Sequence, residues 1–177
     1  MPRELVLYIA STLDGFIAKE NDDLQWLYDT EGEGDAGYTK MYQSIDTVIM
    51  GKRTYDYVLK HSEVFPYPDK KCYVFTTSEK GSNEYVEFVN EDVVEFTKRL
   101  RKQEGSKIWL VGGSGILDAF IKENLIDEYI ITFTPHILGS GIPLFKENNP
   151  QINLNLIDTK RFGQFVQLHL KVNQNKS

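Results

Sequence analysis

The stretch "IWLVGGSGIL", residues 108–117, runs four apolar residues directly into Gly-Gly-Ser-Gly and then resumes with apolar residues. Each glycine in an ordered element costs about 0.5–1 kcal/mol relative to alanine, because it loses more backbone freedom on folding. A turn of small residues between a strand and a helix exposes unpaired backbone N–H groups, and the helix dipole adds partial positive charge there. The stretch therefore predicts a strand, a turn and a helix start that either receives a phosphate or only packs closely.

This glycine turn differs from three common glycine motifs. No lysine and hydroxyl follow it as in a Walker loop. Ser114 has Gly112 two positions before it but Ile116 two positions after it, so the turn is not a nucleophile elbow. The dinucleotide fingerprint lacks its third glycine, since Asp118 stands there, and the next strand ends in "ITFT" without an acid for a ribose. A phosphate-binding turn of another kind remains.

Short apolar runs that are rich in β-branched and aromatic residues predict six strands around this turn. These runs cover residues 5–10, 47–50, 72–77, 85–89, 107–111 and 128–134. Several are continuously apolar, which is typical of strands covered on both faces. Between the runs, helical patterns cover residues 36–44, 53–60, 92–104 and 115–124.

The C-terminal region has a different pattern. After Gly163, apolar residues from Val166 to Val172 alternate with polar ones, which predicts an antiparallel hairpin with one wetter face. Strand–helix alternation followed by such a hairpin predicts a three-layer α/β/α fold whose central sheet is mostly parallel. We expect one domain over residues 1–177, in which the acidic stretch 28–37 is a loop and not a domain boundary.

The bulk composition limits the classes of partner. A formal net charge of −6 argues against nucleic acid or an anionic membrane as the main partner. No apolar run reaches the roughly 18 residues of a membrane span, and no signal-peptide pattern is present. The lone Cys72 excludes an internal disulfide and is typical of a cytoplasmic protein, which we expect here. The three histidines and this cysteine have no zinc-type spacing, so no metal is expected.

Three further strand ends share the character of the glycine turn. In "VIMGKRTYD", Gly51 is followed by two cations and a hydroxyl at a helix start, which favours an anion site. "FTTSEK" ends another strand with hydroxyls that could contact a further phosphate. "ASTLDGFIA" leaves the first strand through Asp14-Gly15 as a loop that either covers a ligand or is a plain surface turn. Together these ends favour a ligand with several phosphates, and a dinucleotide fits best.

These four stretches, in this order, resemble the dihydrofolate reductase superfamily over nearly the whole chain. "LIDEYIITFTPHILGSGIPLF", residues 125–145, looks particularly like the branch that contains the reductase domain of riboflavin biosynthesis, the C-terminal domain of the bacterial bifunctional deaminase-reductase. The resemblance implies a dihydrofolate-reductase-like fold. It also implies that the peptide between Gly112 and Gly113 is cis.

The resemblance further implies that the cofactor is NADPH. The strand ends carry hydroxyls and cations but no carboxylate that would bind a ribose. Such a site prefers a cofactor with a 2′-phosphate over one with a 2′-hydroxyl. Two residues would flank the nicotinamide, two glycines would let the backbone approach it, and the others would follow the phosphates and the adenosine. The implied cofactor residues are Ala10, Ile17, Gly51, Lys52, Arg53, Thr54, Thr76, Thr77, Ser78, Gly112, Gly113, Ser114, Gly115, Ile116 and Leu117.

The substrate end has four candidate residues. Asp35 stands where folate-reducing relatives carry an acid, and a buried acid with a raised pKa could assist protonation of a C=N bond. Alternatively, Asp35 only caps the helix at 36–44. Trp26 either stacks on a planar ring or packs as a lid, Asp14 lies in the covering loop, and Thr132 matches a substrate-contacting threonine of the family.

The resulting hypothesis is an NADPH-dependent reductase that passes a hydride to a C=N bond of a pterin- or pyrimidine-type substrate. The first choice of reaction is reduction of 5-amino-6-(5-phosphoribosylamino)uracil in riboflavin biosynthesis, and reduction of dihydrofolate is the second. A non-catalytic NADPH-binding sensor is the alternative from another class. Because relatives of the riboflavin type pair, we also expect a homodimer.

Overall fold

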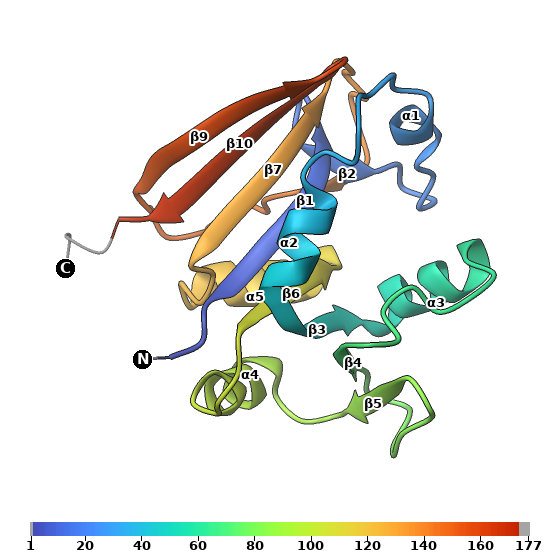
Figure 1. Ribbon diagram of the computed structural model, residues 1–177, viewed down its shortest axis with the longest axis vertical. Coiled ribbons are helices and arrows are strands. Elements are labelled where there is room, and N and C mark those ends of the chain that lie inside the picture. The colour runs from blue at the N-terminus through green and yellow to red at the C-terminus, as the bar shows by residue number, and fades with distance from the viewer. Residues whose placement is uncertain (1, 174–177) are drawn as a thin grey trace.

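The computed structural model describes residues 2–173, which form an eight-stranded sheet in the order β5-β4-β3-β6-β1-β7-β10-β9 and a separate two-stranded sheet of β2 and β8 (Figure 1). The strands are β1 (Leu5–Thr12), β2 (Phe16–Ala18), β3 (Ile45–Gly51), β4 (Lys71–Phe75), β5 (Val86–Val89), β6 (Lys107–Gly112), β7 (Glu128–Thr134), β8 (Ile142–Pro143), β9 (Leu154–Phe162) and β10 (Phe165–Val172). The helices are α1 (Gln25–Tyr28), α2 (Tyr38–Ser44), α3 (Lys52–His61), α4 (Val93–Arg101) and α5 (Ser114–Lys122).

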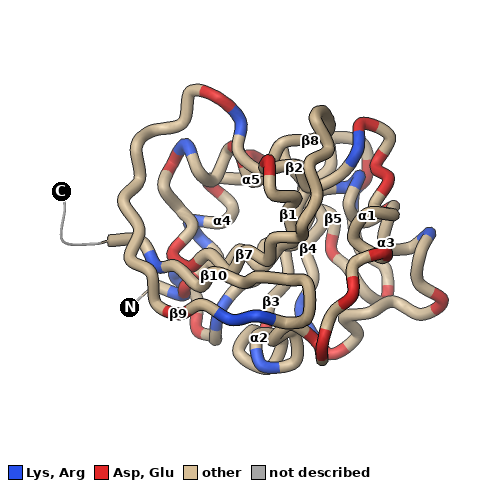
Figure 2. The backbone as a smooth tube through the Cα atoms, turned by 90° about the horizontal axis from the view of Figure 1, so that it is seen from above, with Lys and Arg blue, Asp and Glu red and all other residues tan. Residues whose placement is uncertain are grey.

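The pairing confirms a mostly parallel sheet with an antiparallel C-terminal hairpin. Strands β1, β3, β4, β5, β6 and β7 pair in parallel, whereas β10 pairs antiparallel with both β7 and β9. Each of the six predicted strands and four predicted helices is present, with ends shifted by a few residues. The acidic stretch between α1 and α2 is a loop, as the sequence predicted (Figure 2).

Helices cover both faces of the sheet, so the three predicted layers are present. On one face, α4 and α5 pack through side chains such as Leu100 and Phe120 against β1 and β6. On the other face, Met41 of α2 and Tyr55 of α3 pack against β3, β4 and Trp109 of β6. The continuous apolar runs of the central strands are explained by this double coverage.

The small β2–β8 sheet fixes the loop that leaves β1. Gly141, just before β8, has a φ of +148°, and a Cβ at this position would lie 2.4 Å from the carbonyl oxygen of Ala18. Only glycine lets the two backbones approach so closely. No sequence pattern predicted these strands of two and three residues or the four-residue α1.

The C-terminal hairpin differs from the prediction of one wetter face. Nearly every residue of β9 is exposed, including Leu156 and Ile157, whose exposed fractions are 58% and 52%. No helix of the described chain lies over β9, because the helices cover the central strands (Figure 1). Both faces of this edge strand are therefore wet, and alternation alone could not show how far the helices extend.

Among residues 2–173, no helix has the length and hydropathy needed to cross a bilayer.

Candidate functional site

The parallel strands bring three of the predicted strand ends to one rim of the sheet. Strand β3 lies between β4 and β6, so Gly51, Phe75 and Gly112 end side by side. Ligands of open α/β sheets bind at such carboxyl ends. A groove of about 470 Å³ lies there. Ten of the implied cofactor residues line it: Gly51, Lys52, Arg53, Thr54, Thr76, Thr77, Gly113, Ser114, Gly115 and Ile116.

Two helices begin at this groove with open N-termini. Gly51 precedes α3 and Gly113 precedes α5, and neither helix has a side-chain cap for its first N–H groups. A Cβ on Gly113 would lie 3.2 Å from the hydroxyl of Thr54, and one on Gly51 would lie 3.0 Å from Ile116. The Gly112–Gly113 peptide is cis, as the resemblance implied. The groove therefore presents backbone donors and two positive helix ends to a ligand.

Two cations of the groove, Lys52 and Arg53, are paired with carboxylates. The Lys52 ammonium lies 2.6 Å from Asp56 and 2.9 Å from Glu79. Hydrogen bonds to Asp56 and then to Glu79 raise the pKa of Lys52. The Nε of Arg53 donates to Asp22 at 2.8 Å. Each of these two groups therefore faces at least one carboxylate partner.

Lys146 is a groove residue that no sequence motif predicted. It lies in the segment after β8, and its exposed side chain lines the groove with Ser114 and Gly115. It lies about thirty residues after the glycine turn, in no motif that points to a ligand. The tertiary fold brings it there, so the sequence carried no signal for it.

Five implied cofactor residues lie outside the groove lining, and three of them, Ser78, Gly112 and Leu117, lie close to it in the sequence. Leu117 lies on α5 with its side chain fully buried in the core, and its contact with the cofactor stays a prediction. Gly112 is buried, with a φ of +150°, directly behind the groove. Ser78 is exposed, and its N–H donates to the hydroxyl of Thr76 at 3.2 Å.

Ala10 and Ile17 lie along the loop side of the rim. Both are half-buried, Ala10 pairs in register with Thr132, and Ile17 packs against the core. Neither lines the groove of the phosphate end. Their position beside the nicotinamide stays a prediction.

Asp14 ties two loops together. Its carboxylate accepts hydrogen bonds from the Thr12 hydroxyl at 2.6 Å and from the N–H groups of Leu138 and Gly139 at 3.2 and 2.9 Å. The Thr12 hydroxyl first, and these amides next, lower the pKa of Asp14. The carboxylate therefore holds the loop after β1 against the loop after β7, and its substrate contact stays a prediction.

Trp26 of α1 lies at the same rim with an orphaned donor. Its side chain is 5% exposed, and its buried Nε1 has no hydrogen-bond partner among the described residues. The ring of His136 lies beside it, with centroids 6.2 Å apart, and the Nδ1 of His136 lies 3.0 Å from the Thr134 hydroxyl. A buried N–H without an acceptor carries a free-energy cost, so this position suits a ligand oxygen or a water.

Thr132 is buried on β7, and its hydroxyl is engaged within the protein. The Gln167 amide donates to this hydroxyl at 3.0 Å and to the Ala36 carbonyl at 2.7 Å. The Tyr8 hydroxyl donates to the same carbonyl at 2.8 Å. These contacts fasten the start of α2 to the sheet, and a substrate contact of Thr132 stays a prediction.

The expectation that Asp35 is a buried acid with a raised pKa is wrong. The side chain is exposed, and its two oxygens accept from the N–H groups of Gly37 and Thr39 at 3.1 and 3.0 Å. Hydrogen bonds from the Thr39 hydroxyl and amide lower its pKa. The geometry is that of the alternative, a carboxylate that caps the first turn of α2. A catalytic role of Asp35 stays a prediction.

Within residues 2–173, no three His, Cys, Asp or Glu side chains are grouped so that they could hold a metal ion.

The sheet order, the glycine turn and the groove define a protein of the dihydrofolate-reductase-like fold. Dihydrofolate reductase from Enterococcus faecalis superposes with a TM-score of 0.63 over 97% of each chain, at 19% identity. A protein of Shewanella sp. PV-4, assigned provisionally to riboflavin biosynthesis, superposes with a TM-score of 0.87 at 28% identity, covering 98% of this chain and all of that one.

The family model of the RibD C-terminal domain matches residues 3–168. YwjB, an uncharacterized protein of Bacillus subtilis (strain 168), is 53% identical over 170 residues, which cover 96% of this chain and 98% of YwjB. The chain therefore belongs to the RibD C-terminal domain family, within the riboflavin-biosynthesis reductase-like branch of the dihydrofolate-reductase-like superfamily. That family is one of reductases, which indicates an oxidoreductase.

Proposed function

We propose that the protein is an NADPH-dependent reductase that transfers a hydride to a C=N bond of a pyrimidine- or pterin-type substrate. The groove at the ends of β3, β4 and β6 carries the proposal, because it gathers ten residues from three separate stretches of sequence. Family membership supports the reaction type.

The donor set of the groove fits a phosphorylated dinucleotide. Hydroxyls of Thr54, Thr76 and Ser114 and the ammonium of Lys146 can donate to phosphate oxygens. The groove contains one carboxylate, Glu91, and the guanidinium of Arg99 holds it at 2.6 Å. The Enterococcus faecalis reductase, which shares the fold, is described in complex with NADP(H).

Bound NADPH would supply the hydride for the carbon of the C=N bond, while a proton reaches its nitrogen. The chain itself would hold the two reactants in register and keep water out. The open N-termini of α3 and α5 would bind the phosphates, with Lys52, Arg53 and Lys146 around them. Trp26, with its orphaned Nε1, would cover the substrate end and donate to a ring oxygen.

A ribosylaminopyrimidine of the riboflavin pathway is the first choice of substrate, because the chain belongs to the RibD C-terminal domain family. Dihydrofolate is the alternative substrate, which the shared fold supports. A screen of both substrates, followed by the loss of NADPH absorbance, separates the two.

NADPH titration of the pure protein tests the first step. We expect saturable enhancement of nicotinamide fluorescence and weaker binding of NADH, which lacks the 2′-phosphate. A Lys146→Ala substitution should lower the affinity for NADPH about three- to tenfold, because it removes one charged hydrogen bond. Lys98→Ala, a change of the same type on α4, is the matched control. Absence of saturable binding would exclude the proposal.

A second candidate function is a non-catalytic NADPH sensor, which the exposure of Asp35 favours. Asparagine can cap a helix as well as aspartate. We therefore expect Asp35→Asn to keep NADPH affinity and any turnover, with activity measured on the two substrates above. A loss of turnover at unchanged NADPH affinity would instead assign the catalytic acid to Asp35. If neither substrate is reduced by the wild-type protein, the sensor is favoured.

We also propose that two copies pair through the exposed edge of β9. An edge strand with unpaired backbone groups is a template for pairing with a second chain. Leu156 and Ile157 add exposed apolar surface there.

A further inference from the structure

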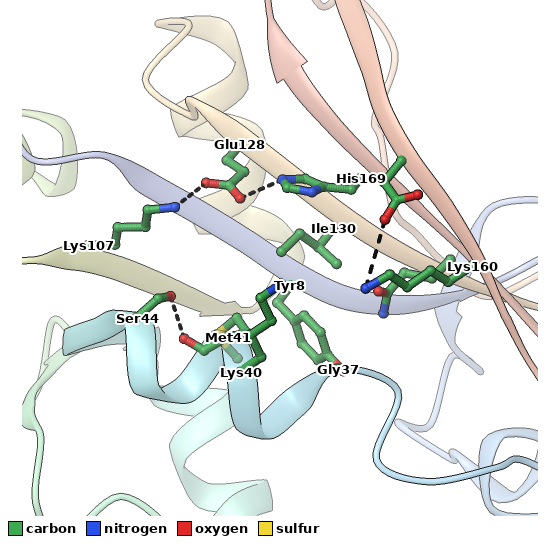
Figure 3. Close-up of a pocket in the computed structure, with 12 residues that line it drawn as sticks. Tyr8, Gly37, Lys40, Met41, Ser44, Lys107, Glu128, Ile130, Lys160 and His169 are labelled. Carbon is green, nitrogen blue, oxygen red and sulfur yellow. Dashed lines mark hydrogen bonds and ion pairs between the residues drawn. The ribbon is translucent and has the colours of Figure 1, made fainter.

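A separate cavity of about 200 Å³ lies between helix α2 and the strands β7, β10 and β9 (Figure 3). Its lining includes the apolar side chains of Met41 and Ile130 and the ring of Tyr8. Three lysines, a histidine and two carboxylates line it as well. A cavity of about 150 Å³ suffices to hold benzene, so the space fits a small organic molecule.

One of the two carboxylates is already fully engaged. Glu128 has a side chain only 5% exposed, and it lies 2.8 Å from the ammonium of Lys107 and 2.6 Å from the Nε2 of His169. Figure 3 shows this row of three side chains along one wall. These partners satisfy the carboxylate, so it does not balance the other cations of the cavity.

The remaining cations are Lys40 of α2 and Lys160 of β9. Lys160 has its carboxylate, Asp158, only at 3.8 Å, and within the described part of the chain Lys40 forms no ion pair. In Figure 3 both lysine side chains reach from opposite walls toward the space over Tyr8 and Ile130. The basic segments of α2 and β9 also lie near one another when seen from above (Figure 2). The cavity therefore has an excess positive charge in a chain of net charge −6.

The cavity is distinct from the proposed cofactor groove and from the substrate end. No residue lines both the cavity and the groove. Toward the substrate end, the contacts of Gln167 with Ala36 and Thr132, and of Tyr8 with Ala36, close the cavity. A ligand in the cavity would thus lie on the far side of this hydrogen-bonded wall.

We propose that this cavity binds a small organic carboxylate with an apolar or aromatic body. The carboxylate would lie between the ammonium groups of Lys40 and Lys160, where hydrogen bonds assisted by charge are strong. The body would lie on Tyr8, Met41 and Ile130. Mostly apolar walls with a few polar groups are typical of small-molecule sites. This site does not depend on the proposed reductase activity.

Benzoate and its neutral analogue benzamide test the proposal by titration into the ¹⁵N-labelled full chain, observed by NMR. We expect saturable shifts at the amides of Gly37, Ser44 and Ile130, with benzoate bound about tenfold more tightly than benzamide. Equal affinity for the two compounds would overturn the proposal, and so would shifts that gather at Gly115 and Thr54. Saturating NADPH should leave the benzoate affinity unchanged.

Two variants assign the charge. Lys40→Met and Lys160→Met keep an unbranched side chain but remove the ammonium group. Each substitution should lower the affinity for benzoate about fivefold or more. Lys98→Met on α4, on the opposite face of the sheet, is the matched control and should leave the affinity unchanged. The remainder of each spectrum reports whether the variant is folded. Undiminished benzoate binding by the folded Lys40→Met and Lys160→Met variants would contradict the site.

Discussion

Glu128 is a buried carboxylate whose charge depends on two neighbours. Burial raises the pKa of Glu128. The hydrogen bonds and charges of Lys107 and then of His169 lower it by more than burial raises it, so the pKa lies below its ordinary value of 4.5. A carboxylate with a lowered pKa in the folded state stabilises the fold above its unfolded pKa. That contribution is lost as the pH falls through the folded pKa.

The first prediction concerns this carboxylate. Glu128→Gln should lower the free energy of unfolding by about 2 kcal/mol at pH 7, because it leaves Lys107 and His169 without a charged partner. The difference from wild type should shrink as the pH falls below 4.5, where the unfolded carboxylate becomes protonated. Urea denaturation at a series of pH values measures it. Asp118→Asn, which breaks the i,i+4 pair with Lys122, should change stability by no more than about 0.5 kcal/mol.

Cys72 is a buried cysteine on β4. The side chain is 1% exposed, and burial raises the pKa of its thiol to about 12. Since the thiolate is the reactive form, the native protein should react with a disulfide reagent at pH 8 about a hundredfold more slowly than the denatured one. Rapid modification without denaturant would show that the strand β4 opens readily.

The sequence predicted the groove residues that directly follow a strand. It did not predict residues whose role depends on whether the tertiary fold buries or exposes their side chains. Thr54, Thr76 and Ser114 each follow an apolar run, so the parallel order of the strands was enough to bring them together. The exposure of Asp35 depends on how α2 is placed against the sheet, which its neighbours in sequence do not determine. Lys146 directly follows the stretch 125–145, but no motif of the sequence includes it.

At the scale of elements, the helices differ in how their N-termini are satisfied. Helix α4 has its own cap, because the Asp92 side chain accepts from the N–H of Glu95 at 2.9 Å. Helices α3 and α5, which begin at the groove, have glycine at the N-cap and no side-chain cap. Open N–H groups are thus found at the two helices that face the proposed cofactor.

Gly115 of α5 separates stability from binding. Nothing lies within 4 Å of a Cβ built on it, and the residue lines the groove. Gly115→Ala should stabilise the free protein by about 0.5 kcal/mol, because alanine is the better helix former. The added methyl group should also lower the affinity for NADPH about tenfold or more, because it keeps a phosphate away from the backbone N–H groups.

Thermal unfolding and NADPH titration measure the two effects. Lys122→Ala, on the last turn of the same helix and outside the groove, is the matched control and should leave NADPH affinity unchanged. A Gly115→Ala protein that binds NADPH as wild type does would mean that phosphate does not approach this helix end.

The elements themselves were predictable in proportion to their length. The strands and helices of the large sheet showed clear periodicity, and the turn at Gly163 predicted the hairpin between β9 and β10. Helix α1, β2 and β8 span only two to four residues, too few for a period to show. Their positions depend on contacts across the chain, such as the approach of Gly141 to Ala18.

On the scale of the whole molecule, the two edges of the sheet are unlike. Strand β5 at one edge has four residues, whereas β9 at the other has nine and is exposed nearly throughout. A long uncovered edge strand with apolar side chains is a site for association between copies.

The corresponding prediction is a loss of pairing. Leu156→Lys should turn a dimer into a monomer by placing a charge on the edge, while changing monomer stability by no more than about 0.5 kcal/mol. Sedimentation velocity measures the mass. Val64→Lys, a change of the same kind at a side chain 70% exposed beyond α3, is the control and should leave the mass unchanged. A wild-type protein that sediments as a monomer would contradict pairing outright.

The pairing of Lys52 with Asp56 and Glu79, and of Arg53 with Asp22, has a consequence for discrimination among anions. Each of these ammonium and guanidinium groups must exchange a carboxylate partner for an anion before it can bind that anion. Chloride or a single inorganic phosphate is poorly equipped for that exchange, whereas a ligand with phosphates at several points can complete it. The ion pairs of the free protein would therefore favour polyvalent anions over chloride and inorganic phosphate.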